Sequence, residues 1–112
     1  MNLIDAATLR AWQLQTKNFV LLDTLPSDSF ANGHLPGAIN IVSDDILQRA
    51  PEALTDKHAL IVVYCASATC KRAGLSAARL ESLGYTRVNH FVGGKKDWID
   101  AGLPLVTGLA TV

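Results

Sequence analysis

The chain has 112 residues, which is enough for one domain whose core forms without metal or disulfide support. Ten basic and ten acidic residues give a formal net charge of zero, so the charge favours neither nucleic acid nor a membrane surface as a partner. Hydrophobic residues make up 49%, as in compact soluble folds, yet no apolar run approaches the ~20 residues of a membrane-spanning helix. We therefore expect residues 1–112 to form a single domain.

The first predicted helix covers residues 5–16. Asp5 is a suitable N-cap, and Leu9, Trp12 and Leu14 provide its apolar positions. The early acid, and the lack of a basic start followed by an apolar core, argue against a signal peptide. The two cysteines, five positions apart, do not make the disulfide framework of a secreted protein. The sequence therefore predicts a cytoplasmic protein with reduced thiols.

Strands and short helices are predicted to alternate up to residue 51. Ser27 and Ser43 have side chains suited to helix N-caps, and Pro51 is expected to disturb the end of the helix that Ser43 begins. The predicted elements are a strand over 19–23, a helix over 27–32, a strand over 38–41 and a helix over 43–49.

The second half of the chain continues this alternation. Leu75, Ala78 and Leu83 fall near the spacing of one helical face, and Gly84 is a natural residue to follow a helix. The predicted elements are a strand over 60–64, a helix over 71–83, a strand over 88–92 and a helix over 95–98. Alternating strands and helices favour an α/β domain with a mainly parallel sheet.

Cys65 is the residue that says most about function. Parallel sheets of this class bind ligands beyond the carboxyl ends of their strands, where Asp23, Cys65 and the Gly93–Gly94 turn are predicted to lie. Cys65 also opens the turn into the following helix. Backbone N–H groups of that turn and the helix dipole favour a thiolate over a thiol, which makes Cys65 a candidate nucleophile.

Four segments, taken together, indicate a known family. They are Leu21–Asp23, Gly33–Asn40, Val62–Cys65, and Gly84–Trp98 with Gly102–Pro104. In this order they resemble the rhodanese homology domain, and they cover nearly the whole chain.

The resemblance implies a rhodanese-like fold, with a five-stranded, mainly parallel sheet flanked by helices on both faces. It implies a sulfurtransferase or persulfide carrier in which Cys65 takes sulfane sulfur from a small donor such as thiosulfate or a persulfide. Cyanide or a thiol would accept the sulfur, and a protein acceptor of unknown identity is a further partner class. The resemblance implies no cofactor.

Two departures from the family pattern concern the donor rather than the fold. Leu25 and Ser29 stand where the family commonly has an Arg and an acid. The loop after Cys65 is a residue or two longer than in the common single-domain members, with Ala68 near the position of a usual Gly. Cys70 replaces a basic residue that is often found late in this loop.

The loop after Cys65 is the predicted substrate-binding segment, because its backbone N–H groups can hold an anionic persulfide without side-chain chemistry. Lys71 and Arg72 also favour an anionic donor, since cations at a helix start oppose the dipole and need another reason to be there. Arg72 is the better candidate because its planar fork matches an oxyanion. The predicted substrate-binding residues are Ala66, Ser67, Ala68, Thr69, Cys70, Lys71 and Arg72.

Cys70 has two interpretations. As a resolving thiol it would attack the Cys65 persulfide and release hydrosulfide, whereas as a packing residue it would sit half-buried at the start of the helix. A zinc site is disfavoured because the two cysteines lack the usual knuckle spacing and the histidines are dispersed along the chain, so we predict no metal.

Five residues are predicted to support the site structurally. Asp23 would cap or orient a nearby loop, and His34 would hydrogen-bond backbone in a tight turn rather than shuttle protons. Gly93 and Gly94 would let the backbone approach the loop closely, and Trp98 would pack in the core with its N–H bonded.

Two other functions are possible from the sequence. The first is an oxyanion-processing thiol enzyme, a phosphatase or an arsenate reductase. The cell-cycle tyrosine phosphatases that share this fold place an Arg after five loop residues, but here Lys71 stands there, Arg72 is one position late, and the loop has no acid. A non-catalytic interaction module usually lacks the loop cysteine, so Cys65 argues against it.

Overall fold

The centre of the molecule is a sheet of five parallel strands. The computed structural model describes residues 1–108 and gives the strand order β1-β5-β4-β2-β3. The strands are β1 (Asn2–Ile4), β2 (Val20–Asp23), β3 (Ile39–Asn40), β4 (Ile61–Tyr64) and β5 (Val88–Phe91). The five-stranded parallel sheet expected from the sequence is confirmed.

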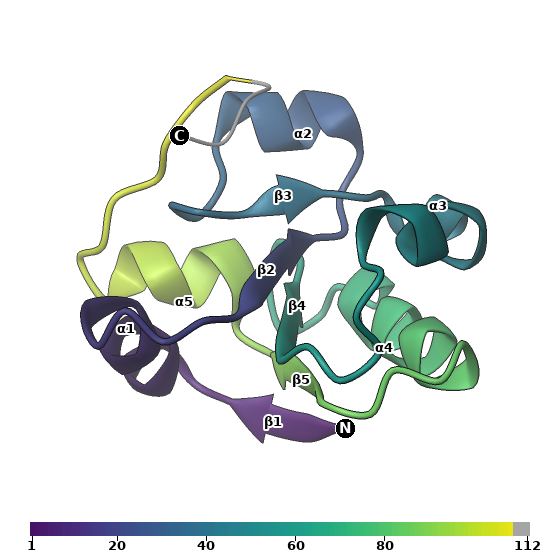
Figure 1. Ribbon diagram of the computed structural model, residues 1–112. Coiled ribbons are helices and arrows are strands. Elements are labelled where there is room, and N and C mark those ends of the chain that lie inside the picture. The colour runs from purple at the N-terminus through teal and green to yellow at the C-terminus, as the bar shows by residue number, and fades with distance from the viewer. Residues whose placement is uncertain (109–112) are drawn as a thin grey trace.

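Helices cover both faces of this sheet (Figure 1). They are α1 (Ala6–Leu14), α2 (Ser27–Asn32), α3 (Ile46–Ala53), α4 (Arg72–Ser82) and α5 (Gly94–Asp100), with a short 3₁₀ helix η1 (Ser43–Asp45) before α3. In Figure 1, α3 and α4 lie together on one side of the sheet, while α1 and α5 lie on the other. Among the residues described, no helix is long and apolar enough to cross a membrane.

The alternation of side chains along β4 divides the interior into two hydrophobic clusters. Ile61 and Val63 belong to the cluster under α3 and α4, whereas Val62 and Tyr64 belong to the cluster that includes Trp98 of α5. All four residues of β4 are fully buried, as expected of a central strand in a parallel sheet.

Several local expectations are corrected by the structure. β1 was not predicted, because three mostly exposed residues show no alternation. Ser27 and Ser43 do not act as N-caps: Pro26 and Val42 occupy those positions. Pro51 lies inside α3 on an exposed position and does not end it.

The face of α4 that packs on the sheet also differs from the expected one. Leu75 is 51% exposed and Ala78 is also exposed, so neither belongs to the buried stripe. The buried residues of α4 are the small ones and one leucine, namely Ala73, Ser76, Ala77 and Leu80. Small residues let the helix backbone approach the sheet closely, which a ranking by hydrophobicity does not reveal.

The start of α5 packs directly against the chain leaving β4. The N–H of Lys95 donates to the Cys65 carbonyl at 3.0 Å, and the N–H of Lys96 donates to the Ala66 carbonyl at 3.0 Å. Gly94 makes this approach possible, because its φ is +62° and a Cβ there would overlap the carbonyl group of Cys65. The position of Cys65 is therefore set by backbone contacts from a distant part of the chain.

Replacing Gly94 with alanine should destabilise the protein by more than a left-handed backbone alone explains. Gly102→Ala is the matched control, because Gly102 also has a positive φ (+79°) but open space around its Cβ position. The left-handed backbone conformation should lower the free energy of unfolding of both variants by about 1–2 kcal/mol. The overlap with Cys65 should lower that of Gly94→Ala by about 1–3 kcal/mol more. Urea unfolding of both variants measures the difference. Equal losses would show that the close approach does not constrain residue 94.

Candidate active site

Cys65 follows directly after β4 at the carboxyl end of the sheet. It is only 2% exposed, and it continues the alternation of β4 into the cluster under α3 and α4. Its carbonyl is held by α5, as described above. The sulfur of Cys65 is thus positioned at the point where parallel α/β sheets place their ligands.

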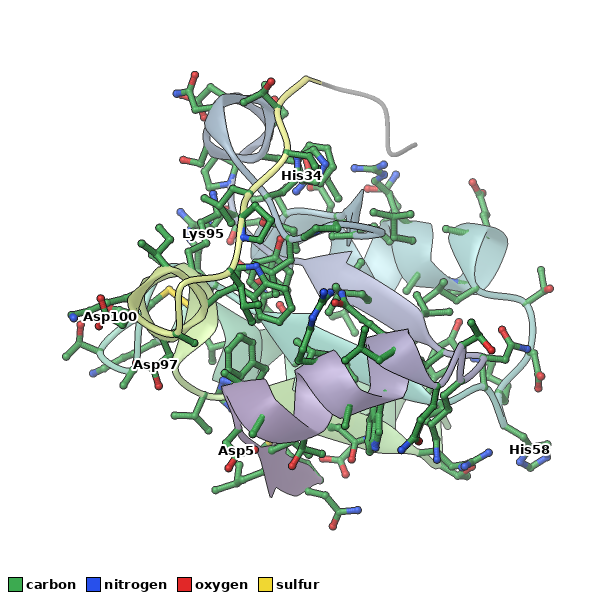
Figure 2. All side chains as sticks on the ribbon, turned by 90° about the vertical axis from the view of Figure 1, so that its left-hand side faces the viewer. Asp5, His34, His58, Lys95, Asp97 and Asp100 are labelled. Atoms are coloured by element: carbon green, nitrogen blue, oxygen red, sulfur yellow. A yellow bond between two sulfur atoms is a disulfide. The ribbon has the colours of Figure 1, made fainter. Side chains whose placement is uncertain are left out.

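Cys70 meets Cys65 across the loop, and the two residues form a disulfide (Figure 2). Their Cα atoms are 6.3 Å apart, within the range that a disulfide spans without displacing the backbone. Cys70 is half-buried and packs against the same hydrophobic cluster as Cys65. The reduced pair expected from the sequence is therefore found oxidised, and of the two placements considered for Cys70 the structure shows the one facing Cys65.

The segment 66–71, hereafter the Cys65 loop, has many unused backbone donors. The N–H of Cys70 donates to the Ser67 carbonyl at 3.1 Å, and the hydroxyls of Ser67 and Thr69 are 3.0 Å apart. Within the described chain, the N–H groups of residues 66–69 and 71 have no protein acceptor. These donors remain available to an anion in or beside the loop.

The two basic residues at the end of the Cys65 loop, Lys71 in the loop and Arg72 at the start of α4, differ in their contacts. Arg72 is half-buried, and its Nη1 donates to the Ser43 hydroxyl at 3.0 Å, which ties it to η1. The side chain of Lys71 is exposed and makes no hydrogen bond or ion pair within residues 1–108, although its carbonyl accepts from the Leu75 N–H at 3.1 Å. Within residues 1–108 the other guanidinium N–H groups of Arg72 have no acceptor, because Ser43 accepts only from Nη1.

A buried polar network lies on the opposite face of β4. Asp23 accepts hydrogen bonds from the Leu25 N–H at 2.9 Å and from the Tyr64 hydroxyl at 2.8 Å, and the Leu35 N–H donates to that hydroxyl at 3.1 Å. Burial raises the pKa of Asp23 and also that of Tyr64. Asp23 thus joins the end of β2, the end of β4 and the 33–37 turn.

Sequence reasoning missed Tyr64 and Lys95. Tyr64 immediately precedes Cys65, but a tyrosine in a buried strand gives no sign of an acid partner 41 positions away. The Nζ of Lys95 donates to the Ser29 carbonyl at 2.9 Å, and burial lowers the pKa of Lys95 while the nearby Asp23 carboxylate raises it. Figure 2 shows Lys95 on the same side of the molecule as His34.

His34 and Trp98 bond to backbone groups. The ring of His34 stacks on Phe30 and its Nδ1 donates to the Phe30 carbonyl at 2.8 Å. The Nε2 of His34 is buried without a partner in the described residues. Trp98 donates from Nε1 to the Pro104 carbonyl at 2.9 Å. No group of three or more His, Cys, Asp or Glu side chains within residues 1–108 is placed to hold a metal ion.

Comparisons with known proteins agree on one family. The family model of the rhodanese-like domain matches residues 5–101. A thiosulfate sulfurtransferase of Escherichia coli (strain K12) is 31% identical over 87 residues, which are 78% of this chain and 78% of that protein. The crystal structure of a thiosulfate sulfurtransferase from Pseudomonas aeruginosa has a TM-score of 0.86 at 27% identity, covering 96% of this chain and 20% of that one.

One relative carries a different kind of name. An HTH-type transcriptional regulator of Mycobacterium tuberculosis is 35% identical over 88 residues, which are 79% of this chain and 38% of the regulator. This chain spans less than two thirds of the length of several curated relatives that it matches.

The buried Asp23 should give the protein a distinct pH dependence of stability. Its pKa is raised above 3.8 by burial, so the folded chain holds this proton to a higher pH than the unfolded chain does. The free energy of unfolding therefore falls as the pH rises from 3.8 through the folded pKa. Asp23→Asn lacks this ionisation, so its stability relative to the wild type should improve over that range and then level off.

Asp5→Asn is the control for this experiment, because hydrogen bonds from Thr8 lower the pKa of Asp5 and its effect has the opposite sign. Its stability relative to the wild type should decline as the pH rises toward 3.8. Urea unfolding at several pH values measures both curves. A constant difference between Asp23→Asn and the wild type would contradict the raised pKa.

Proposed function

Because this chain belongs to the rhodanese-like domain family, we propose that it is a sulfurtransferase that carries sulfane sulfur as a persulfide on Cys65. The observation that carries this proposal is the Cys65 loop, which follows a buried strand-end cysteine and has N–H groups, at 66–69 and 71, without an acceptor in the described part of the chain. The relatives named as thiosulfate sulfurtransferases support it. We also propose that residues 1–112 act as one domain.

The reaction begins with the reduced protein. The Cys65 thiolate attacks the outer sulfur of thiosulfate, the S–S bond of the donor breaks, and sulfite leaves with the electron pair. The Cys65 persulfide that remains is anionic, and the N–H groups of the Cys65 loop stabilise its charge. Cyanide or a thiolate then attacks the outer sulfur and releases the Cys65 thiolate. No step needs a cofactor.

The donor and the compartment follow from the same chemistry. Arg72 provides the remaining arm of its fork to an anionic donor at the rim of the loop, while a neutral persulfide donor needs only the loop N–H groups. The Cys65–Cys70 disulfide must be reduced before Cys65 reacts. The reducing cytoplasm maintains thiols in that state, and we propose this location.

An oxyanion-processing activity fits the site less well. Lys71 stands at the position of a phosphate-binding Arg, and a lysine makes no bidentate contact with phosphate. Arg72, the first residue of α4, is hydrogen-bonded to Ser43 of η1, so only part of its guanidinium is available to an oxyanion. The Cys65 loop also has no carboxyl group to protonate a leaving alcohol.

Cys65→Ser should abolish sulfur transfer while leaving the fold intact, because a hydroxyl does not form the persulfide. The matched control is Cys70→Ser, which removes the other half of the disulfide and should keep most transfer from thiosulfate to cyanide. Thiocyanate formation by both pre-reduced variants, with circular dichroism to check folding, provides the measurement. Turnover by folded Cys65→Ser would refute the mechanism.

Arg72→Ala should weaken the use of thiosulfate more than Lys71→Ala does. An exposed contact contributes about 1 kcal/mol and a desolvated one about 2–3 kcal/mol, so kcat/KM should fall several-fold to about a hundredfold. Arg72→Lys is the control, since it keeps the charge but loses the fork. Steady-state kinetics with thiosulfate separate these cases. An unchanged kcat/KM in Arg72→Ala would mean that the loop N–H groups alone bind the donor.

A further inference from the structure

We propose that Cys70 attacks the Cys65 persulfide, so that the protein also reduces sulfane sulfur to hydrosulfide at the expense of an external dithiol. This proposal rests on the proposed persulfide at Cys65. It adds a second outcome for the same sulfur atom and a second class of partner, a dithiol reductant. The disulfide seen in the structure is the product of this step.

The geometry brings the two sulfurs together without rearranging the scaffold. The Cα atoms of Cys65 and Cys70 are 6.3 Å apart, and the sulfurs are already bonded. The Cys65 carbonyl is anchored by α5, and Cys70 lies two residues before the start of α4. The N–H of Cys70 is bonded to the Ser67 carbonyl, so a turn within the loop directs the chain back toward Cys65.

The step balances without any further reactant. The Cys70 thiolate attacks the inner sulfur, which is the Sγ of Cys65, and a new S–S bond joins the two cysteines. The bond between that Sγ and the outer sulfur breaks, and the outer sulfur leaves as hydrosulfide with the proton from the persulfide or the Cys70 thiol. The sulfane sulfur is reduced by two electrons, and the two cysteine sulfurs are each oxidised by one.

The proposed step competes with sulfur transfer for the same persulfide. Cyanide and thiols attack the outer sulfur from solution, whereas Cys70 attacks the inner sulfur from the same loop. A short tether holds its group at an effective concentration on the order of millimolar. Transfer should therefore prevail only with acceptors that are abundant or that bind beside the loop.

Differences in exposure set the order of the reductive half-reaction. Cys65 is 2% exposed, whereas Cys70 is half-buried and has part of its surface open to solvent. An external dithiol thus attacks Cys70 first and forms a mixed disulfide there. The Cys65 thiolate is the leaving group, and the unpaired loop N–H groups favour that role. The second thiol of the reductant then frees Cys70.

The order of reduction is tested on the oxidised protein with 2-mercaptoethanol as the probe. Brief exposure followed by acid quenching stops thiol exchange, and peptide mapping locates the mixed disulfide. The expected adduct is on Cys70. An adduct on Cys65 would overturn the assigned order.

The resolving step itself is tested in a single anaerobic turnover. Reduced wild type, freed of reductant, receives one equivalent of thiosulfate with no thiol or cyanide present. The wild type should release sulfite and an equal amount of hydrosulfide, and intact mass should show the loss of two hydrogens. Cys70→Ser should still release sulfite but no hydrosulfide, and it should gain one sulfur. Cys70→Ala should behave like Cys70→Ser, which would assign the effect to the missing thiol.

The two proposals fail in different ways in this experiment. Sulfite without hydrosulfide from the wild type, together with a lasting gain of one sulfur, would overturn the resolving role and leave the persulfide chemistry intact. Equal hydrosulfide from the wild type and both Cys70 variants would also overturn it. Absence of sulfite from all three proteins would overturn the proposed function, and the resolving step with it.

Discussion

The site depends on one backbone junction, in which the first N–H groups of α5 hold the carbonyls of Cys65 and Ala66. These bonds run from backbone to backbone, so they do not depend on which side chains the loop carries. This junction requires glycine at position 94, because any side chain there would overlap the Cys65 carbonyl. The alternation of β4 then directs the Cys65 sulfur toward α4 and away from α5. Backbone contacts from α5 on one face of the sheet thus fix the residue whose sulfur lies on the other face.

The second constraint is the polar network on the α5 side. A buried carboxylate is costly, and Asp23 is tolerated because the Leu25 N–H and the Tyr64 hydroxyl compensate part of its lost hydration. The Tyr64 hydroxyl in turn accepts from the Leu35 N–H, so a hydrogen bond ties the turn before β3 to the end of β4. Tyr64, the residue next to Cys65, is therefore anchored by hydrogen bonds as well as by packing.

The sequence predicted those features that local patterns determine. The buried runs at β4 and β5 and the Asp5 cap of α1 were confirmed, as was the parallel α/β fold. β1 was not predicted, because it is a strand by virtue of its pairing with β5 and its sequence shows no alternation of apolar and polar residues. The cap expected at Ser43 is absent because Ser43 lies inside η1, and its side chain accepts from Arg72, 29 positions along the sequence. Tyr64 and Lys95 were missed for the same reason, since their partners lie far along the chain. The five-residue spacing of the cysteines allowed either placement of Cys70, and only the folded loop distinguishes them.

Helices outside the Cys65 loop hold both of its ends in place. α5 fastens its beginning, and the packing of α4 on the sheet fastens its end. Its middle is exposed and makes few bonds to the rest of the protein. The length and composition of such a loop can change over evolution while the elements around it stay constant. Loops transplanted from other members into this chain would therefore compare their chemistries against one fixed background.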